Sequence, residues 1–74
     1  MKNIQDVYDE VESICREEYQ TCTEGQYFYA EETTSEEVKK NILSKMKPEH
    51  AKMKFLNIVA CIMDINGKVF INMI

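Results

Sequence analysis

The sequence predicts an α+β domain in which two N-terminal amphipathic helices are followed by an antiparallel β-hairpin, the order α-α-β-β. Three observations predict it: two stretches with helical spacing of apolar residues, a nearly continuous apolar run after Lys52, and an Asn-Gly pair that interrupts this run. A chain of 74 residues makes one domain, residues 1–74. Such a chain buries only about 60% of its unfolded surface, so we expect the fold to be completed by dimerisation.

The first helix is predicted from about residue 3 to about residue 20. Asn3 is a suitable N-cap, and charged residues fill the face opposite the apolar stripe. Weak helix formers and Gly25 in the segment 21–26 are expected to end the helix. The stripe follows the i, i+3, i+4, i+7 spacing and consists of Ile4, Val7, Tyr8, Val11, Ile14, Cys15 and Tyr19.

An aromatic triplet, Tyr27-Phe28-Tyr29, lies in the connection that follows. Aromatic rings in a connection could stack on nucleic-acid bases, but such platforms come with basic grooves. Glu31 and Glu32 follow the triplet instead. We therefore expect a loop that packs its rings over the core.

The second helix is predicted over about residues 34–47. The spacing of Thr34 and Glu37 is that of a capping box, and Pro48 disfavours helical geometry at the residue before it. Glutamates at the start and lysines at the end of this segment complement the helix dipole. Its apolar stripe consists of Val38, Ile42, Leu43 and Met46.

Two strands are predicted, over about residues 53–65 and 68–74. The first is nearly continuously apolar, which is typical of a strand buried on both faces, and Asn66-Gly67 suits a type I′ turn. We expect the returning strand to have no third neighbour within the chain, and an unpaired apolar edge is a template for another chain. The predicted partner-binding residues are Lys68, Val69, Phe70, Ile71 and Asn72.

Charge is unevenly distributed along the chain. Residues 1–37 carry eleven acids against two bases, a net of −9, whereas residues 38–74 carry seven bases against two acids, a net of +5. The overall charge of −4 argues against nucleic-acid binding, where a basic face supplies most of the affinity. The acidic half is expected to be a solvated helix face. An alternative is a surface for a basic partner, formed by Glu10, Glu12, Glu17 and Glu18.

The cysteines Cys15, Cys22 and Cys61 are odd in number and have neither disulfide-framework nor zinc-site spacing. We expect reduced, buried thiols and hence a reducing, intracellular compartment, that is the cytoplasm. Residues 1–6 turn acidic at once and lack the apolar region of a signal peptide. No apolar run reaches the length of a membrane span, so we expect no membrane partner.

Residues that would carry catalysis are sparse. His50 stands alone without a second histidine or a cysteine at ligand spacing, and we expect it to be exposed or to cap a helix. Ser13 and Ser35 lack a nucleophile motif, and Gly25 and Gly67 are too isolated for a phosphate loop. We therefore expect no catalytic residue, no metal and no cofactor, and a protein that is not an enzyme.

The chain resembles the Tctex-type dynein light chains over roughly residues 7–71. The resemblance rests on Asp9-Glu10-Val11 in the first helix, a loop with glycine and tyrosine, and a second helix opened by Thr33-Thr34. It rests above all on the strand Ile58-Val59-Ala60-Cys61-Ile62-Met63 followed by Asn66-Gly67. That family continues for further strands beyond this point, so the resemblance implies a truncated or divergent member.

The resemblance implies two helices packed on a sheet, a homodimer formed by strand exchange, and a peptide of a dynein intermediate chain or cargo added along an exposed edge. Residues 68–72 match the exchanged or edge strand. The first functional hypothesis is therefore a non-catalytic, light-chain-like adaptor that dimerises through its C-terminal strands and binds an extended peptide.

A second hypothesis is a small acidic inhibitor, such as a phage anti-defence protein, that blocks a basic site on a host enzyme with the acidic first half. A third is a subunit of a larger complex that binds no peptide. Charge reversal on the first helix separates the inhibitor from the adaptor, whereas Phe70→Lys or Ile71→Lys affects the adaptor.

Overall fold

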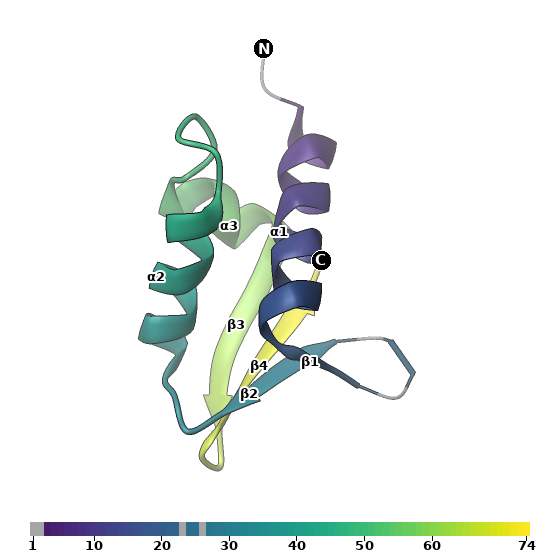
Figure 1. Ribbon diagram of the computed structural model, residues 1–74, viewed down its shortest axis with the longest axis vertical. Helices are drawn as coiled ribbons and strands as arrows, with labels where there is room; N and C mark the ends of the chain where they lie inside the picture. Colours follow the sequence, from purple (N-terminus) through teal and green to yellow (C-terminus); the bar gives the residue numbers. More distant parts are fainter. Residues whose placement is uncertain (1–2, 23, 26) are drawn as a thin grey trace.

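The computed structural model describes residues 3–22, 24–25 and 27–74, and its elements follow the order α-β-β-α-α-β-β (Figure 1). Met1, Lys2, Thr23 and Gln26 lie outside the described residues, as do the parts of the predicted N-terminal segment and the 21–26 connection that include them. The elements are α1 (Ile4–Glu18), β1 (Gln20–Thr21), β2 (Phe28–Glu31), α2 (Ser35–Lys45), α3 (Met53–Val59), β3 (Ala60–Ile65) and β4 (Lys68–Met73).

Both predicted helices are present, with the predicted N-caps. The Asn3 side chain accepts a hydrogen bond from the Gln5 backbone N–H at 2.9 Å and opens α1. At α2, the Thr34 hydroxyl accepts the Glu37 N–H at 3.2 Å. The second half of the expected capping box differs, because the Glu37 carboxylate accepts from the Thr33 hydroxyl at 3.0 Å.

The prediction of a strand over residues 53–65 is wrong in its first half, which forms α3. Leu56 and Val59, one helical turn apart, are both buried, whereas Asn57 and Ile58 between them are exposed. This burial follows the helical period, and a continuous apolar run does not distinguish it from a buried strand. The helix ends where Ala60 becomes extended, and β3 begins there.

The prediction that the aromatic triplet is a loop is also wrong, because Phe28–Glu31 forms β2. This strand and the short β1 lie between the first two helices, so the predicted order α-α-β-β is incorrect. Phe28 is buried and Ala30 half-buried against the core, whereas Glu31 faces solvent. The segment therefore alternates as a half-buried strand does.

The four strands form an antiparallel sheet in the order β1-β2-β4-β3. The β3–β4 hairpin confirms the predicted turn, with Asn66 at φ 50° and Gly67 at φ 81°, the positive values that a type I′ turn needs. The longest-range pairing joins β2 to β4, for example Phe28 opposite Ile71. The segment of chain between these two strands contains α2, α3 and β3.

All three helices contribute to a core on one face of the sheet. Inward-facing residues of the strands meet the buried stripes of the helices, and the opposite face of the sheet is left to solvent. The prediction that the first strand of the hairpin is buried on both faces is therefore wrong. The buried core consists of Val7, Val11, Cys15, Phe28, Val38, Ile42, Met46, Leu56, Val59, Ala60, Val69 and Ile71.

Candidate interaction surface

The outer face of the sheet carries a continuous row of side chains across three strands. Tyr29 of β2 lies opposite Phe70 of β4, which in turn lies opposite Met63 of β3. A parallel row joins Glu31, Lys68 and Ile65. Residues that directly face each other across antiparallel strands point to the same side of the sheet, so these two rows form one surface.

Aromatic rings cluster at the β2–β4 part of this surface. The Tyr27 ring meets Phe70 edge-on with centroids 5.6 Å apart, and it lies 6.5 Å from the Tyr29 ring. Lys68 places its Nζ 5.8 Å from the Tyr29 centroid and 4.0 Å from the Glu31 carboxylate. The expectation that the rings of Tyr27, Phe28 and Tyr29 pack over the core holds for Phe28 alone. The alternation of Phe28, Tyr29, Ala30 and Glu31 was the signal that could have identified this outward face.

The edge of the sheet at β3 is the second part of the surface. The Ile74 N–H donates to the Val59 carbonyl at 2.9 Å, which makes these two residues a hydrogen-bonded pair just before Ala60. Such pairs alternate along an antiparallel ladder, so Cys61, Met63 and Ile65 turn their backbone groups toward β4. Ala60, Ile62 and Asp64 turn theirs away from it.

The outward backbone groups of β3 lack a neighbouring strand in the described part of the chain, since β3 ends the strand order. The Ala60 N–H is used to close α3, where it donates to the Leu56 carbonyl. Ile62 and Asp64 therefore present the edge N–H groups, and Ala60, Ile62 and Asp64 the edge carbonyls. Met63 and Ile65 are 37% and 45% exposed beside this edge, which makes it an apolar one.

The predicted partner-binding strand, residues 68–72, lies at the centre of the sheet. The expectation that it has no third neighbour is wrong, because it pairs with β2 on one side and β3 on the other. Val69 and Ile71 are fully buried, whereas Lys68, Phe70 and Asn72 point to the outer face. Its backbone is thus committed within the chain, and the free edge of the hairpin belongs to β3.

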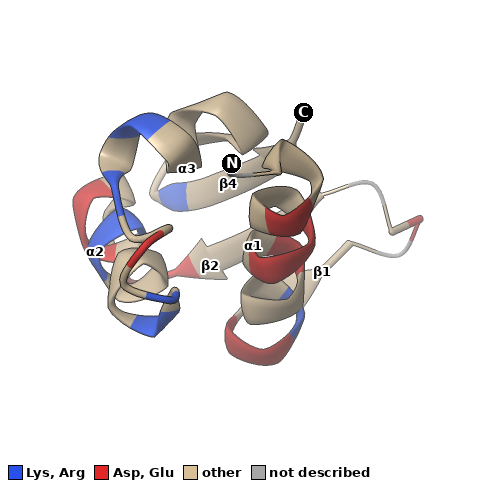
Figure 2. Cartoon of the chain, turned by 90° about the horizontal axis from the view of Figure 1, so that it is seen from above, with Lys and Arg blue, Asp and Glu red and all other residues tan. Residues whose placement is uncertain are grey.

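The predicted acidic residues all lie on α1 but do not share one side of it. Glu10 and Glu17 are two turns apart on one side, whereas Glu12 lies two residues beyond Glu10 and faces elsewhere. Glu12 pairs with Arg16 at 3.5 Å, and Glu18 pairs with Lys45 at 3.7 Å. Figure 2 shows acidic residues along α1 and most basic ones on the side of α2 and α3.

Glu10 forms a clamp, by which we mean its two hydrogen bonds from α1 to the connection between α2 and α3. Its carboxylate accepts the Nδ1–H of His50 at 2.9 Å and the Lys47 backbone N–H at 2.9 Å. The two side chains are only 16% and 10% exposed. Exposure, one of the two settings expected for His50, is therefore wrong. The bond to Glu10 tethers the connection between α2 and α3 to the first helix. A shallow hollow of about 580 Å³ beside it is lined by Asp6, Asp9, Glu10, Lys47, Glu49 and His50.

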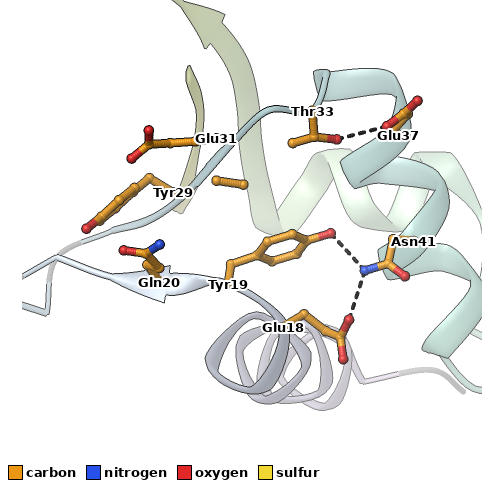
Figure 3. A pocket seen from close by; sticks show the side chains of 9 residues that line it. Glu18, Tyr19, Gln20, Tyr29, Glu31, Thr33, Glu37 and Asn41 are labelled. Carbon is orange, nitrogen blue, oxygen red and sulfur yellow. Dashed lines mark hydrogen bonds between the residues drawn. The ribbon is translucent and has the colours of Figure 1, made fainter. Parts of the chain in front are cut away.

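Another hollow, of about 450 Å³, lies between the C-terminal end of α1, β2 and α2 (Figure 3). Asn41 donates through Nδ2 to the Tyr19 hydroxyl at 2.8 Å and to the Glu18 carboxylate at 3.2 Å. Burial raises the pKa of the Tyr19 hydroxyl above its ordinary value. The polar side chains of Glu18, Tyr19 and Asn41 thus bond to one another in this hollow, and their network joins α1 to α2.

An apolar hollow of about 310 Å³ lies at the opposite end of α1, where the chain ends beside α3. Ile4, Ile58 and Ile74 line it and are 46%, 54% and 72% exposed. Gln5, Tyr8 and Val59 complete its lining. It is separate from the outer sheet face, because α3 packs on the other side of the sheet.

The cysteines differ in their environments. Cys15 is a free thiol with no exposed surface, and burial, with a smaller effect of the nearby Glu12 carboxylate, raises its pKa to about 12. Cys22 is buried as expected. The expectation of burial is wrong for Cys61, an exposed free thiol on the outer face of β3. Its side chain alternates away from the core between Ala60 and Ile62.

The described ranges 3–22, 24–25 and 27–74 contain no cluster of three or more histidine, cysteine or acidic residues arranged to hold a metal ion. Within the same ranges, no helix has both the length and the apolar character that crossing a membrane requires. Comparison of the chain with protein-family models, curated proteins and solved structures finds no match.

Proposed function

We propose that the chain is a non-catalytic protein-interaction module that binds an extended segment of protein as an added strand along β3. The single observation that carries the proposal is the free edge of β3, where Ile62 and Asp64 direct their backbone groups away from β4. An added strand gains affinity from main-chain hydrogen bonds and specificity from alternate side chains. The adaptor role and the Tctex-type light-chain resemblance are part of this proposal.

The side chains beside the edge support this binding mode. Met63 and Ile65 are exposed on the outer face, and Ile62 is half-buried on the inner one. A bound strand would cover apolar surface on both of its sides, and burial of apolar area stabilises the complex by about 25 cal/mol per Å². An uncovered apolar edge is otherwise an aggregation hazard, which favours a role in recognition.

Capture experiments with edge variants test the proposal. Ile62→Pro removes an outward N–H and leaves the bonds to β4, and Met63→Lys places a charge at the edge. Immobilised wild-type chain is compared with each variant for proteins retained from a cell extract, after circular dichroism has shown that each variant is folded. We expect both variants to lose a partner that the wild type retains.

The matched control is Glu12→Lys/Glu17→Lys on α1, far from the β3 edge. It should retain the same partner, since neither residue contributes to the sheet. Retention of the partner by folded Ile62→Pro and Met63→Lys would contradict strand addition at β3. Loss of the partner only in the α1 variant would instead support the acidic-inhibitor hypothesis.

A further inference from the structure

The two ends of β3 carry opposite charges. At the C-terminal end, Asp64 bonds to Ser35 at the start of α2, next to exposed Glu36. Lys68, opposite Ile65 at the same end, is offset by Glu31, whose carboxylate lies 4.0 Å from its Nζ. At the N-terminal end, β3 follows directly from α3, whose first turn carries exposed Lys54 after Lys52. Figure 1 shows α3 at one end of β3 and the start of α2 near the other.

We infer that the strand added along β3 is β3 of a second copy of this chain, antiparallel to it about a two-fold axis. The inference rests on the proposed strand addition and names its partner. An antiparallel copy places the acidic end of each strand beside the basic end of the other, whereas a parallel copy would place like charges together. The two four-stranded sheets then form one continuous sheet.

The register follows from the direction of the backbone groups. Outward residues must face outward residues, and the register that pairs all three of them in each strand places Ile62 opposite the partner's Ile62 and Ala60 opposite the partner's Asp64. The half-buried isoleucines then cover each other on the inner side. Asp64 meets a small neutral residue, and its bonds to Ser35 are undisturbed.

On the outer side, this register places Cys61 opposite the partner's Met63. The two-fold axis repeats this pair, so Met63 lies opposite the partner's Cys61. Both side chains are exposed in a single copy. The pairing is of the non-hydrogen-bonded kind, in which Cα atoms lie about 4.5 Å apart. The exposed apolar side chains of the two edges thereby merge into one strip.

Disulfide trapping tests the register. In the variant Met63→Cys, which keeps Cys61, the Cα separation suits a disulfide between copies, because bridged residues have Cα atoms about 4.4–6.8 Å apart. We expect mild oxidation with a copper–phenanthroline oxidant to give a dimer whose peptide map joins position 61 to position 63. Wild type and Cys61→Ser/Met63→Cys are the controls, and each should cross-link much less.

Charged substitutions at the same positions provide a second test of the register. Dimerisation is measured by light scattering under reducing conditions. Cys61→Lys/Met63→Lys places like charges opposite each other twice and should shift the dimer midpoint about tenfold or more to higher concentration. Cys61→Lys/Met63→Glu places opposite charges there and should restore dimerisation, with an added dependence on salt. Both variants change exposed side chains, so the fold of the single copy is preserved.

Preferential bridging of position 61 to 61, or of 63 to 63, would overturn the inferred register. A wild-type chain that stays monomeric at every accessible concentration would overturn self-pairing. That outcome would leave the proposed function standing if the wild type retains a foreign partner that folded Ile62→Pro loses. The two proposals would be overturned together if the wild type stays monomeric and the folded β3 variants retain the same foreign proteins as the wild type.

Discussion

Asp64 accepts two hydrogen bonds from Ser35, one from the backbone N–H at 3.0 Å and one from the hydroxyl at 2.7 Å. Ser35 is the first residue of α2, so the carboxylate lies at the positive end of the helix dipole and satisfies an N–H that has no partner within the helix. The contact ties the edge strand β3 to the helix beside it. A charged residue on the inner side of an edge strand thus has a structural role.

We predict that Asp64→Ala lowers the free energy of unfolding by about 1–2 kcal/mol, the usual cost of losing a side-chain cap at a helix N-terminus. Asp64→Asn keeps an acceptor of the same shape without the charge and should cost less. Urea unfolding followed by circular dichroism measures both. Equal stability of Asp64→Ala and wild type would contradict the role assigned to this contact.

Glu10→Ala is predicted to lower the free energy of unfolding by about 1–3 kcal/mol, because it removes the acceptor of two hydrogen bonds at a mostly buried position. Glu17 lies on the same side of α1 but is exposed. Glu17→Ala should therefore change the free energy of unfolding by less than about 0.5 kcal/mol. Chemical denaturation of the two variants provides the comparison. Similar losses for both would show that the clamp contributes nothing specific.

The cysteines are predicted to react at very different rates with a thiol reagent at neutral pH. Cys61 is exposed, whereas Cys15 is fully buried and its pKa is raised to about 12, so almost no reactive thiolate forms there. Mass mapping after brief alkylation should find label on Cys61 and none on Cys15. Labelling of Cys15 should appear only in denaturant, and rapid labelling of the native chain would refute its burial.

The raised pKa of Cys15 also predicts a loss of stability in alkali. Above the ordinary pKa of 9.0 the unfolded state releases the thiol proton, while the folded state keeps it up to about pH 12. The folded state therefore binds more protons, and stability falls as pH rises through this window, by at most about 1.4 kcal/mol per pH unit from this group. Tyr19 acts in the same direction. Cys15→Ala should show a shallower decline between pH 9 and 10.5, and an unchanged slope would contradict the assignment.

Local signals in the sequence were sufficient for the helices α1 and α2 and for the hairpin turn. Asn3 and Thr34 cap their helices through bonds to residues two and three positions away, and Asn66-Gly67 adopts the positive φ values that this pair favours. Each of these features depends only on neighbours in the chain. Such features can be inferred from spacing and residue type alone.

The errors concern segments whose structure depends on distant contacts. Phe28–Glu31 is a strand because Ile71 and its neighbours pair with it, some forty residues further along the chain. Once β2 occupies one side of β4, the predicted edge strand becomes central and the free edge moves to β3. Residues 53–59 form a helix because Leu56 and Val59 fill the core from one side, which an uninterrupted apolar run does not reveal.

Amide hydrogen exchange of β3 tests the central claim most directly. In dilute chain, Ile62 and Asp64 should exchange quickly, whereas Cys61 and Met63, bonded to β4, should be protected. Raising the concentration, or adding a captured partner, should slow exchange at Ile62 and Asp64 and leave Cys61 and Met63 little changed. Protection of all four amides in the dilute monomer, or unaltered exchange at Ile62 and Asp64 in the complex, would contradict the addition of a strand at this edge.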